Sequence, residues 1–225
     1  MLKQLQKKYT TAFLKPYLTW YLKKERVTKL NGFILTIKPG VFHPKYFFST
    51  GYLFEFISKL NLKNKCFLEI GSGSGIISLL AYQKKAIVTC CDINEQAVAC
   101  TRQNFTRNFN SNFDNFSVYK GDLFDAIPKT HFDIIVINPP YFFKSIEHNH
   151  QLAWNCGENG EYFKKLFTQL HHFIHQKTEV YMILAENCEI ERIQKIATNH
   201  NFKMTLHEQK KIKWEVNYMF KITSK

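Results

Sequence analysis

The chain has 225 residues, 45% of them hydrophobic and 22% charged, which suits one globular domain with a sizeable core. Its longest apolar runs are only as long as strands, and its amino terminus lacks the apolar core of a signal peptide. We therefore expect no transmembrane helix. Six cysteines without a CxxC spacing indicate free thiols in a reducing compartment and no metal site, and from this pattern we predict a cytoplasmic protein.

The net charge of +13 is concentrated at the two ends of the chain. Residues 1–50 contain ten basic residues and one acidic residue, and residues 203–225 contain six basic and two acidic residues. The net charge of the segment between them is zero. Basic ends around a neutral core favour an acidic partner, with RNA or a ribonucleoprotein first. The alternative, a lysine-rich composition that only serves solubility, stays open.

The first forty residues predict a helix and a hairpin. Apolar residues recur at helical spacing with lysines between them, namely Leu2, Leu5, Tyr9 and Phe13. This pattern predicts a basic amphipathic helix that ends near Pro16 and packs on the main domain, with a nucleic-acid or anionic-membrane contact as the alternative. Asn31-Gly32 then predicts a two-residue turn between strands at 26–30 and 33–38.

An aromatic segment, residues 41–50, connects the hairpin to the rest of the chain. It leads into a predicted helix around residues 51–60, for which Ser49 or Thr50 provides the N-cap. Such a segment can cover a bound ligand, and it can equally be a buried connector.

From residue 66 onwards, predicted strands and helices alternate. The strands are 66–70, 86–91, 116–120, 132–137 and 179–184, and the helices are 74–84, 94–109, 159–175 and 188–199. Alternation of this kind requires right-handed crossovers and a mostly parallel sheet. The last two strands, 202–208 and 213–222, have no helix between them and should form an antiparallel hairpin at the sheet edge. We predict an α/β fold of the Rossmann-like doubly wound type, with residues 1–45 as a basic extension and 46–225 as the main domain.

Asn138-Pro139-Pro140-Tyr141 follows the apolar strand 132–137. Because proline cannot continue the hydrogen-bonding ladder, these residues should lie at the carboxyl end of that strand, where open α/β sheets bind ligands. The Asn138 side-chain carbonyl and a nearby main-chain carbonyl can accept both hydrogens of a planar NH2 group. Tyr141 offers an aromatic face for a flat substrate. A proline-rich turn without function is the alternative.

A glycine-rich loop, Glu69-Ile-Gly71-Ser72-Gly73-Ser-Gly75, joins the strand 66–70 to its helix. Gly71 and Gly73 permit a sharp turn and close approach to a ligand, and Gly75 permits close helix–strand packing. The spacing is GxGxG rather than the dinucleotide-binding GxGxxG, and Glu69 would repel a pyrophosphate but suits an ammonium group. These features disfavour an NAD-dependent oxidoreductase.

Two further acids follow the next two strands. Asp92 can accept both ribose hydroxyls of a nucleoside, and Asp122 can accept the exocyclic amine of adenine. Either acid alone is more typical of a cap or a solvated turn. Together with Glu69 they describe a cofactor that carries adenosine and a positive charge but no phosphate. S-adenosylmethionine (SAM) meets these conditions.

Over roughly residues 41–222 the chain resembles the class I SAM-dependent methyltransferases. Residues 69–75 resemble their first motif, Asp92 their ribose-binding acid and Asp122 their adenine-side acid. The resemblance implies a cofactor site formed by Thr50, Glu69, Gly71, Ser72, Gly73, Gly75, Asp92, Ile93, Asp122, Leu123 and Asn138.

Asn138-Pro139-Pro140-Tyr141 resembles the catalytic motif of amino-methyltransferases, which act on NH2 groups of adenine or cytosine or on the glutamine side-chain amide. The layout, including Trp154 and the following Gly157-Glu-Asn-Gly160-Glu, is most similar to release-factor glutamine methyltransferases. Asn-Pro-Pro-Tyr-Phe is also similar to tRNA adenine-N6 methyltransferases. The resemblance thus implies methylation of a glutamine amide in a release factor or other translation protein. The alternatives are an adenine in tRNA, rRNA or DNA, and a non-catalytic module that binds RNA or a partner.

Overall fold

The computed structural model describes residues 24–109, 113–148 and 151–225. The predicted amphipathic helix near the amino terminus lies outside these residues. No helix of the described part is long and apolar enough to cross a membrane.

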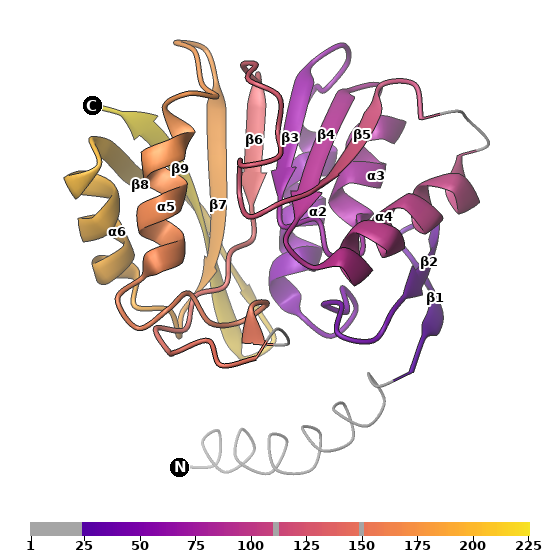
Figure 1. Cartoon of the computed structure of the whole chain (residues 1–225), viewed down its shortest axis with the longest axis horizontal. Helices are drawn as coiled ribbons and strands as arrows, with labels where there is room; N and C mark the ends of the chain where they lie inside the picture. The colour runs from indigo at the N-terminus through magenta and orange to yellow at the C-terminus, as the bar shows by residue number, and fades with distance from the viewer. Residues whose placement is uncertain (1–23, 110–112, 149–150) are drawn as a thin grey trace.

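A seven-stranded sheet forms the centre of the molecule, in the order β5-β4-β3-β6-β7-β9-β8 (Figure 1). Its strands are β3 (Cys66–Ile70), β4 (Ile87–Asp92), β5 (Phe116–Lys120), β6 (Ile134–Ile137), β7 (Glu179–Ala185), β8 (Phe202–Ile212) and β9 (Glu215–Ser224). The pairs among β3 to β7 are parallel, and β9 is antiparallel to both β7 and β8. The predicted fold class and the antiparallel hairpin at the edge are therefore confirmed.

Helices cover both faces of this sheet. They are α2 (Phe48–Lys59), α3 (Ile76–Gln83), α4 (Glu95–Asn108), α5 (Glu161–Leu170) and α6 (Ile190–Asn199). Side chains of a strand point alternately to the two faces, and β6 shows the result. Ile134 and Val136 join a core cluster with α2, α3 and α4, whereas Ile135 and Ile137 join a second cluster with α5 and α6. Burial on both faces explains why β6 is apolar throughout.

The predicted hairpin exists as β1 (Arg26–Leu30) and β2 (Phe33–Ile37), which pair antiparallel. Its inner face belongs to the same core cluster as α2, α3 and α4. Asn104 on α4 extends this contact, because its Oδ1 accepts a hydrogen bond from the buried Thr36 N at 2.6 Å. The division of the chain at residue 45 stays a prediction.

One predicted helix cap is wrong. Helix α2 begins at Phe48 after Phe47, which has no side-chain capping bond, so Ser49 and Thr50 lie within the first turn. Both side chains are buried, and the Ser49 hydroxyl instead accepts a hydrogen bond from Asn138. A sequence pattern detects local caps but cannot show that a residue 89 positions away uses the hydroxyl.

Candidate active site

A cavity of about 300 Å³ opens at the carboxyl ends of β3, β4, β5 and β6, which are neighbours in the sheet. Its walls include all but one of the predicted site residues, namely Thr50, Glu69, Gly71, Ser72, Gly73, Asp92, Ile93, Asp122, Leu123, Asn138, Pro139, Pro140 and Tyr141. Parallel strands end at the same edge of a sheet, and this brings together residues that lie far apart in the chain.

The exception is Gly75, which does not line the cavity. Its φ of +80° is left-handed, and a Cβ there would lie 2.8 Å from Cγ2 of Thr101 on α4. The predicted close packing is present, but its partner is α4 rather than a strand. Gly75 thus allows the loop and the two helices α3 and α4 to approach one another.

The loop itself is held by main-chain hydrogen bonds. Gly71 N and Ser72 N both donate to the Cys91 carbonyl, at 3.0 and 2.9 Å. Gly71 and Gly73 have φ values of +79° and +53°, which are readily adopted only by glycine. The loop therefore turns sharply at the cavity wall without a side chain that would fill the space.

Glu69 is a buried carboxyl group at the base of the cavity. Its Oε2 accepts hydrogen bonds from Ser78 N at 2.9 Å and from Ser78 Oγ. Burial raises the pKa of Glu69 to about 8, against the opposing effect of the Ser78 bonds. Since both bonds use Oε2, Oε1 is available to a cationic group.

The Asp92 carboxylate is orientated by the glycine loop and by the start of α4. Its Oδ2 accepts from Gly73 N at 2.9 Å and its Oδ1 accepts from Asn94 N at 2.8 Å. Burial raises the pKa of Asp92, and these two bonds oppose the shift. Each oxygen keeps a lone pair for a ligand hydroxyl, as ribose recognition requires. Ile93, which follows, is 40% exposed on the cavity wall and offers an apolar contact.

Asp122 is paired in a way that the sequence did not indicate. Lys165 of α5 lies between two carboxylates, with its Nζ 2.6 Å from Asp122 Oδ2 and 2.7 Å from Asp125 Oδ2. These acids raise the pKa of Lys165 above its ordinary value, although burial, the largest single effect, acts to lower it. Lys165 therefore holds Asp122 at the cavity rim, and their ion pair uses Oδ2 of Asp122 rather than Oδ1.

Asn138 lies at the first position after β6. Its Nδ2 donates to Ser49 Oγ at 3.4 Å, so its side-chain carbonyl is the part left for a substrate. The main-chain carbonyl of Asn138 lies 3.9 Å from the position that a Cβ on Gly71 would occupy, which places this strand end directly beside the glycine loop. The arrangement brings Asn138, predicted to bind the substrate NH2 group, and the predicted cofactor loop into one cavity.

Tyr141 is half-buried on the cavity wall. Its ring packs against Phe142 with centroids 4.9 Å apart and the planes at 65°. Burial raises the pKa of Tyr141 well above its ordinary value, so the phenol is neutral at physiological pH. It can contribute an aromatic surface but no negative charge.

The sequence did not predict the aromatic cluster at the cavity. Phe42 stacks on Phe47 with centroids 4.0 Å apart, and Trp154 contacts both rings at 5.1 and 4.8 Å. Phe42 Cβ also lies 3.9 Å from the position of a Cβ on Gly73, so this cluster covers the glycine loop. The aromatic segment 41–50 therefore lies over the predicted cofactor site, as one of its two interpretations required.

Trp154 reaches this cluster because its segment pairs with the residues after the motif. Phe142 N donates to the Trp154 carbonyl and Cys156 N donates to the Phe142 carbonyl, each at 2.9 Å. The sequence signal for this contact was the resemblance around Trp154 and Gly157, which gave the residue no role.

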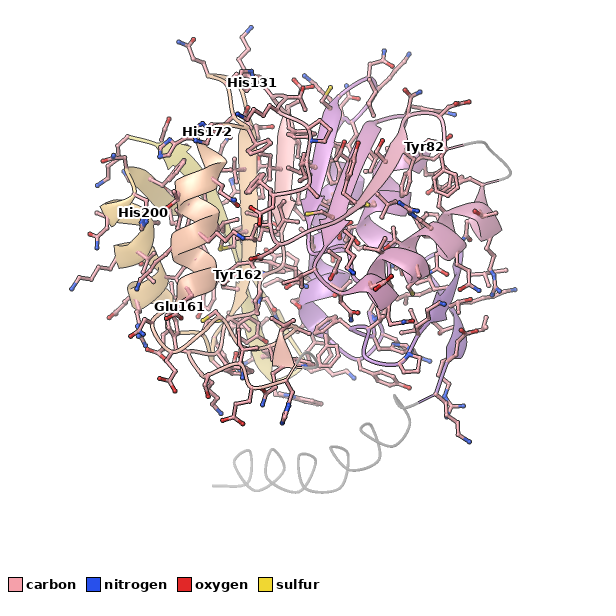
Figure 2. All side chains as sticks on the ribbon, viewed as in Figure 1. Tyr82, His131, Glu161, Tyr162, His172 and His200 are labelled. Atoms are coloured by element: carbon pink, nitrogen blue, oxygen red, sulfur yellow. The ribbon has the colours of Figure 1, made fainter. Side chains whose placement is uncertain are left out.

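Helix α5 supplies two more cavity residues, Glu161 and Tyr162. Figure 2 shows both at the end of the sheet where the cavity lies, whereas His131 lies at the opposite end. No group of three or more His, Cys, Asp or Glu side chains that could hold a metal ion occurs within residues 24–109, 113–148 and 151–225.

The fold and the site define a class of protein. A mostly parallel seven-stranded sheet with a glycine loop, two acids and Asn-Pro-Pro-Tyr at successive strand ends is that of a SAM-dependent methyltransferase. The family model "Methyltransferase small domain" matches residues 32–213, so the chain belongs to this family. The enzyme class and the cofactor, SAM, follow from this membership.

Three curated relatives show how far the similarity extends. The chain is 28% identical over 197 residues to a putative protein N5-glutamine methyltransferase of Methanocaldococcus jannaschii, covering 84% of this chain and 94% of the relative. It is 36% identical over 99 residues to a release factor glutamine methyltransferase of Shewanella oneidensis, covering 42% and 34%. It is 35% identical over 77 residues to a tRNA1(Val) (adenine(37)-N6)-methyltransferase of Vibrio campbellii, covering 33% and 31%. The chain thus aligns with only about a third of the last two relatives.

Solved structures share the fold. A methyltransferase from Pyrococcus furiosus superposes with a TM-score of 0.62 at 19% identity, covering 99% of this chain and 98% of that one. SMU.776, a putative methyltransferase complexed with SAH, superposes with a TM-score of 0.63 at 15% identity, covering 88% of this chain and 56% of that one. At these identities the likeness concerns the fold.

Proposed function

We propose that this enzyme methylates a planar NH2 nitrogen, and that the acceptor is the side-chain amide of a glutamine in a release factor or another translation protein. The observation that carries the proposal is the position of Asn138, whose amide nitrogen is bonded to Ser49 and whose carbonyl is left for the acceptor in the same cavity as the glycine loop. Similarity over nearly the full length of a putative glutamine methyltransferase supports glutamine as the acceptor.

The cavity residues fit SAM by their chemistry. Asp92 would accept the ribose hydroxyls, Glu69 the ammonium group and Asp122 the adenine amine, while Ile93 and Leu123 would flank the base. When bound, SAM supplies a methyl group on a positively charged sulfur. Among the described residues that line the cavity, Lys165 is the one lysine or arginine, and it is already paired with Asp122 and Asp125. The buried carboxyl group of Glu69 suits a cationic ligand group better than a phosphate.

The chain's own contribution to transfer is positioning. The Asn138 side-chain carbonyl and the Pro139 carbonyl accept the two hydrogens of the acceptor NH2, and Tyr141 packs on its plane. These bonds increase the electron density on a nitrogen whose lone pair is otherwise delocalised. They would also fix the direction from which this nitrogen approaches the methyl group that bound SAM supplies. The proton that the nitrogen loses passes to solvent, and no strong general base is required.

Replacing Asn138 tests this mechanism. Asn138→Ala should lower methyl transfer by at least about a hundredfold, the usual cost of a missing transition-state hydrogen bond, while SAM binds almost as before. SAM affinity is measured by calorimetry and transfer with tritiated-methyl SAM. A large loss of SAM affinity with a normal turnover rate would contradict the role assigned to Asn138.

The acceptor is identified with a cell extract that lacks this protein. Purified enzyme and tritiated-methyl SAM are added, and the labelled product is then treated with protease or RNase. Label that protease removes from a band of release-factor size supports glutamine methylation. Label that only RNase removes overturns the glutamine assignment. The acceptor would then be an adenine in RNA, the base that the name of the tRNA-modifying relative gives.

A further inference from the structure

The tip of the β8–β9 hairpin carries an exposed aromatic ring among lysines. Trp214 is 55% exposed, although a tryptophan is normally well covered. Its ring contacts Phe48 edge to face, with centroids 5.7 Å apart. Lys213 Nζ lies 5.5 Å from the Phe48 centroid and 5.6 Å from that of Trp214. We call Lys211, Lys213 and Trp214 the hairpin tip.

The hairpin tip lies next to the catalytic motif. Phe48, its contact, is the first residue of α2, and the next residue, Ser49, accepts the hydrogen bond from Asn138. Figure 1 shows the free end of the β8–β9 hairpin at the end of the sheet where the segment after β6 also lies. A molecule bound to the hairpin tip is therefore close to the acceptor site.

The tip is firmly attached to the domain. Strands β8 and β9 pair from Phe202 to Ile212, and Lys210 forms an ion pair with Glu55 of α2. Lys213 has a left-handed φ of +54°, which a glycine would adopt at lower cost. The tip is thus a preformed surface rather than a loose loop.

The two lysines of the hairpin tip form no ion pair with an acid among the described residues. Within the part of the chain that the structure describes, neither Lys211 nor Lys213 has an acidic group within 4 Å, whereas Lys210 and Lys221 are both paired. The acid nearest in sequence, Glu215, accepts a hydrogen bond from Asn217 Nδ2 at 3.0 Å on its own strand. Because an amide donor leaves the charge of Glu215 in place, the surface of the described part presents two lysines without an ion pair and one acid beside a large ring, a net positive charge.

We propose that the hairpin tip docks the substrate protein through a segment in which acidic side chains and an apolar side chain accompany the methylated glutamine. This inference rests on the proposed function. An exposed tryptophan is a typical binding hot spot, and positive charges around it steer an acidic partner. RNA fits less well, because nucleic-acid affinity is dominated by contacts to many phosphates and this surface offers two lysines without an ion pair to any described acid.

A binding experiment tests the docking site without relying on catalysis. Two fluorescein-labelled peptides of equal length are compared, each with one glutamine and one leucine, with either aspartates or lysines at the flanking positions. Anisotropy is measured with the full chain and SAH. The acidic peptide should bind more tightly, and Lys213→Glu should raise its Kd about three- to tenfold at low salt. Trp214→Ala should weaken it by a similar factor.

Matched control variants lie on the same hairpin, away from the tip. Lys203→Glu makes the same charge change at the other end of β8, and Leu206→Ala removes an apolar side chain that is 47% exposed. Both should leave the Kd unchanged. Equal affinity for the two peptides, no binding, or equal effects of tip and control variants would overturn the docking site.

The outcomes also separate docking from methylation. Tip-dependent binding of the acidic peptide without methyl transfer to its glutamine would support the docking site and count against the proposed acceptor. Methylation of both peptides at equal rates would support the acceptor and overturn the docking site. Single-stranded RNA of matched length serves as the competitor. If it binds at least as tightly as the acidic peptide and loses affinity in Trp214→Ala, the hairpin tip is a nucleic-acid surface and the proposal is wrong.

Discussion

Replacing Gly75 by alanine should destabilise the enzyme strongly, although the change adds one methyl group. Two costs combine at this position. An L-residue at a φ of +80° loses about 1–2 kcal/mol, as left-handed backbone does in general. The new Cβ would also meet Thr101 Cγ2 at 2.8 Å and Oγ1 at 3.0 Å, and overpacking of this kind costs about 1–3 kcal/mol. Together they predict a loss of about 2–5 kcal/mol in the free energy of unfolding.

Two other glycines separate these costs. Gly32 has a φ of +86° with nothing within 4 Å of a Cβ, so Gly32→Ala should cost about 1–2 kcal/mol from the backbone alone. Gly51 lies inside α2 with equally open space, and Gly51→Ala should stabilise by about 1 kcal/mol through helix propensity. Urea unfolding followed by circular dichroism measures all three variants.

A second substitution tests the contact with Thr101 directly. Thr101→Ser removes Cγ2 but keeps the hydroxyl that bonds Ser72 Oγ at 3.1 Å. Added to Gly75→Ala, it should recover part of the lost stability. If Gly75→Ala costs no more than Gly32→Ala, or if Thr101→Ser recovers nothing, steric contact between the glycine loop and α4 is not what requires glycine here.

Three further predictions concern the cofactor site. Asp92→Asn should weaken SAM binding by at least about tenfold, because an amide nitrogen replaces one carboxylate oxygen that accepts hydrogen bonds. Calorimetry measures the SAM affinity, and an unchanged affinity would exclude Asp92 from ribose binding. The pKa of Glu69 is raised from 4.5 to about 8, so the folded state binds this proton more tightly than the unfolded state does. The contribution of Glu69 to the free energy of unfolding should therefore fall as pH rises from about 4.5 to about 8. If ionised Glu69 binds the ammonium group, SAM affinity should rise with pH up to about 8 in the natural enzyme and stay flat in Glu69→Gln; parallel profiles would refute that role. Lys165→Met should change the free energy of unfolding by no more than about 1 kcal/mol, since the ion pairs of Lys165 are substantially exposed. A loss of several kcal/mol, measured by urea unfolding, would contradict this and show a buried structural role.

Sequence reasoning located most of the cavity because the relevant residues follow strands. The expected strand 132–137 ends in the apolar run Ile134–Ile137, and a Pro-Pro pair follows one residue later, so the place of Asn138 was determined locally. The same holds for Asp92, which ends β4, and for Asp122 and the glycine loop, which follow β5 and β3. In a parallel sheet such residues must meet at one edge, and no knowledge of side-chain packing is needed to predict that.

Other features depended on contacts between distant segments. The helix expected at 159–175 ends at Leu170, and the closing strands run to Ile212 and Ser224, beyond the expected ends. Element boundaries are decided by tertiary hydrogen bonds as much as by local pattern. The pairing of Lys165 with Asp122 likewise joins residues 43 positions apart.

The sequence by itself determined the sheet, the order of its motifs and the kind of cofactor, because these depend on local hydrophobic pattern and on residue types at strand ends. Only the tertiary structure showed that Ser49 orientates Asn138 rather than capping α2, and that Phe42, Phe47 and Trp154 cover the glycine loop. The contact between Trp214 of the hairpin tip and Phe48 was likewise shown only by the tertiary structure. The physical reason is that such contacts arise between side chains brought together by packing, and no periodicity in the chain encodes which surfaces will meet.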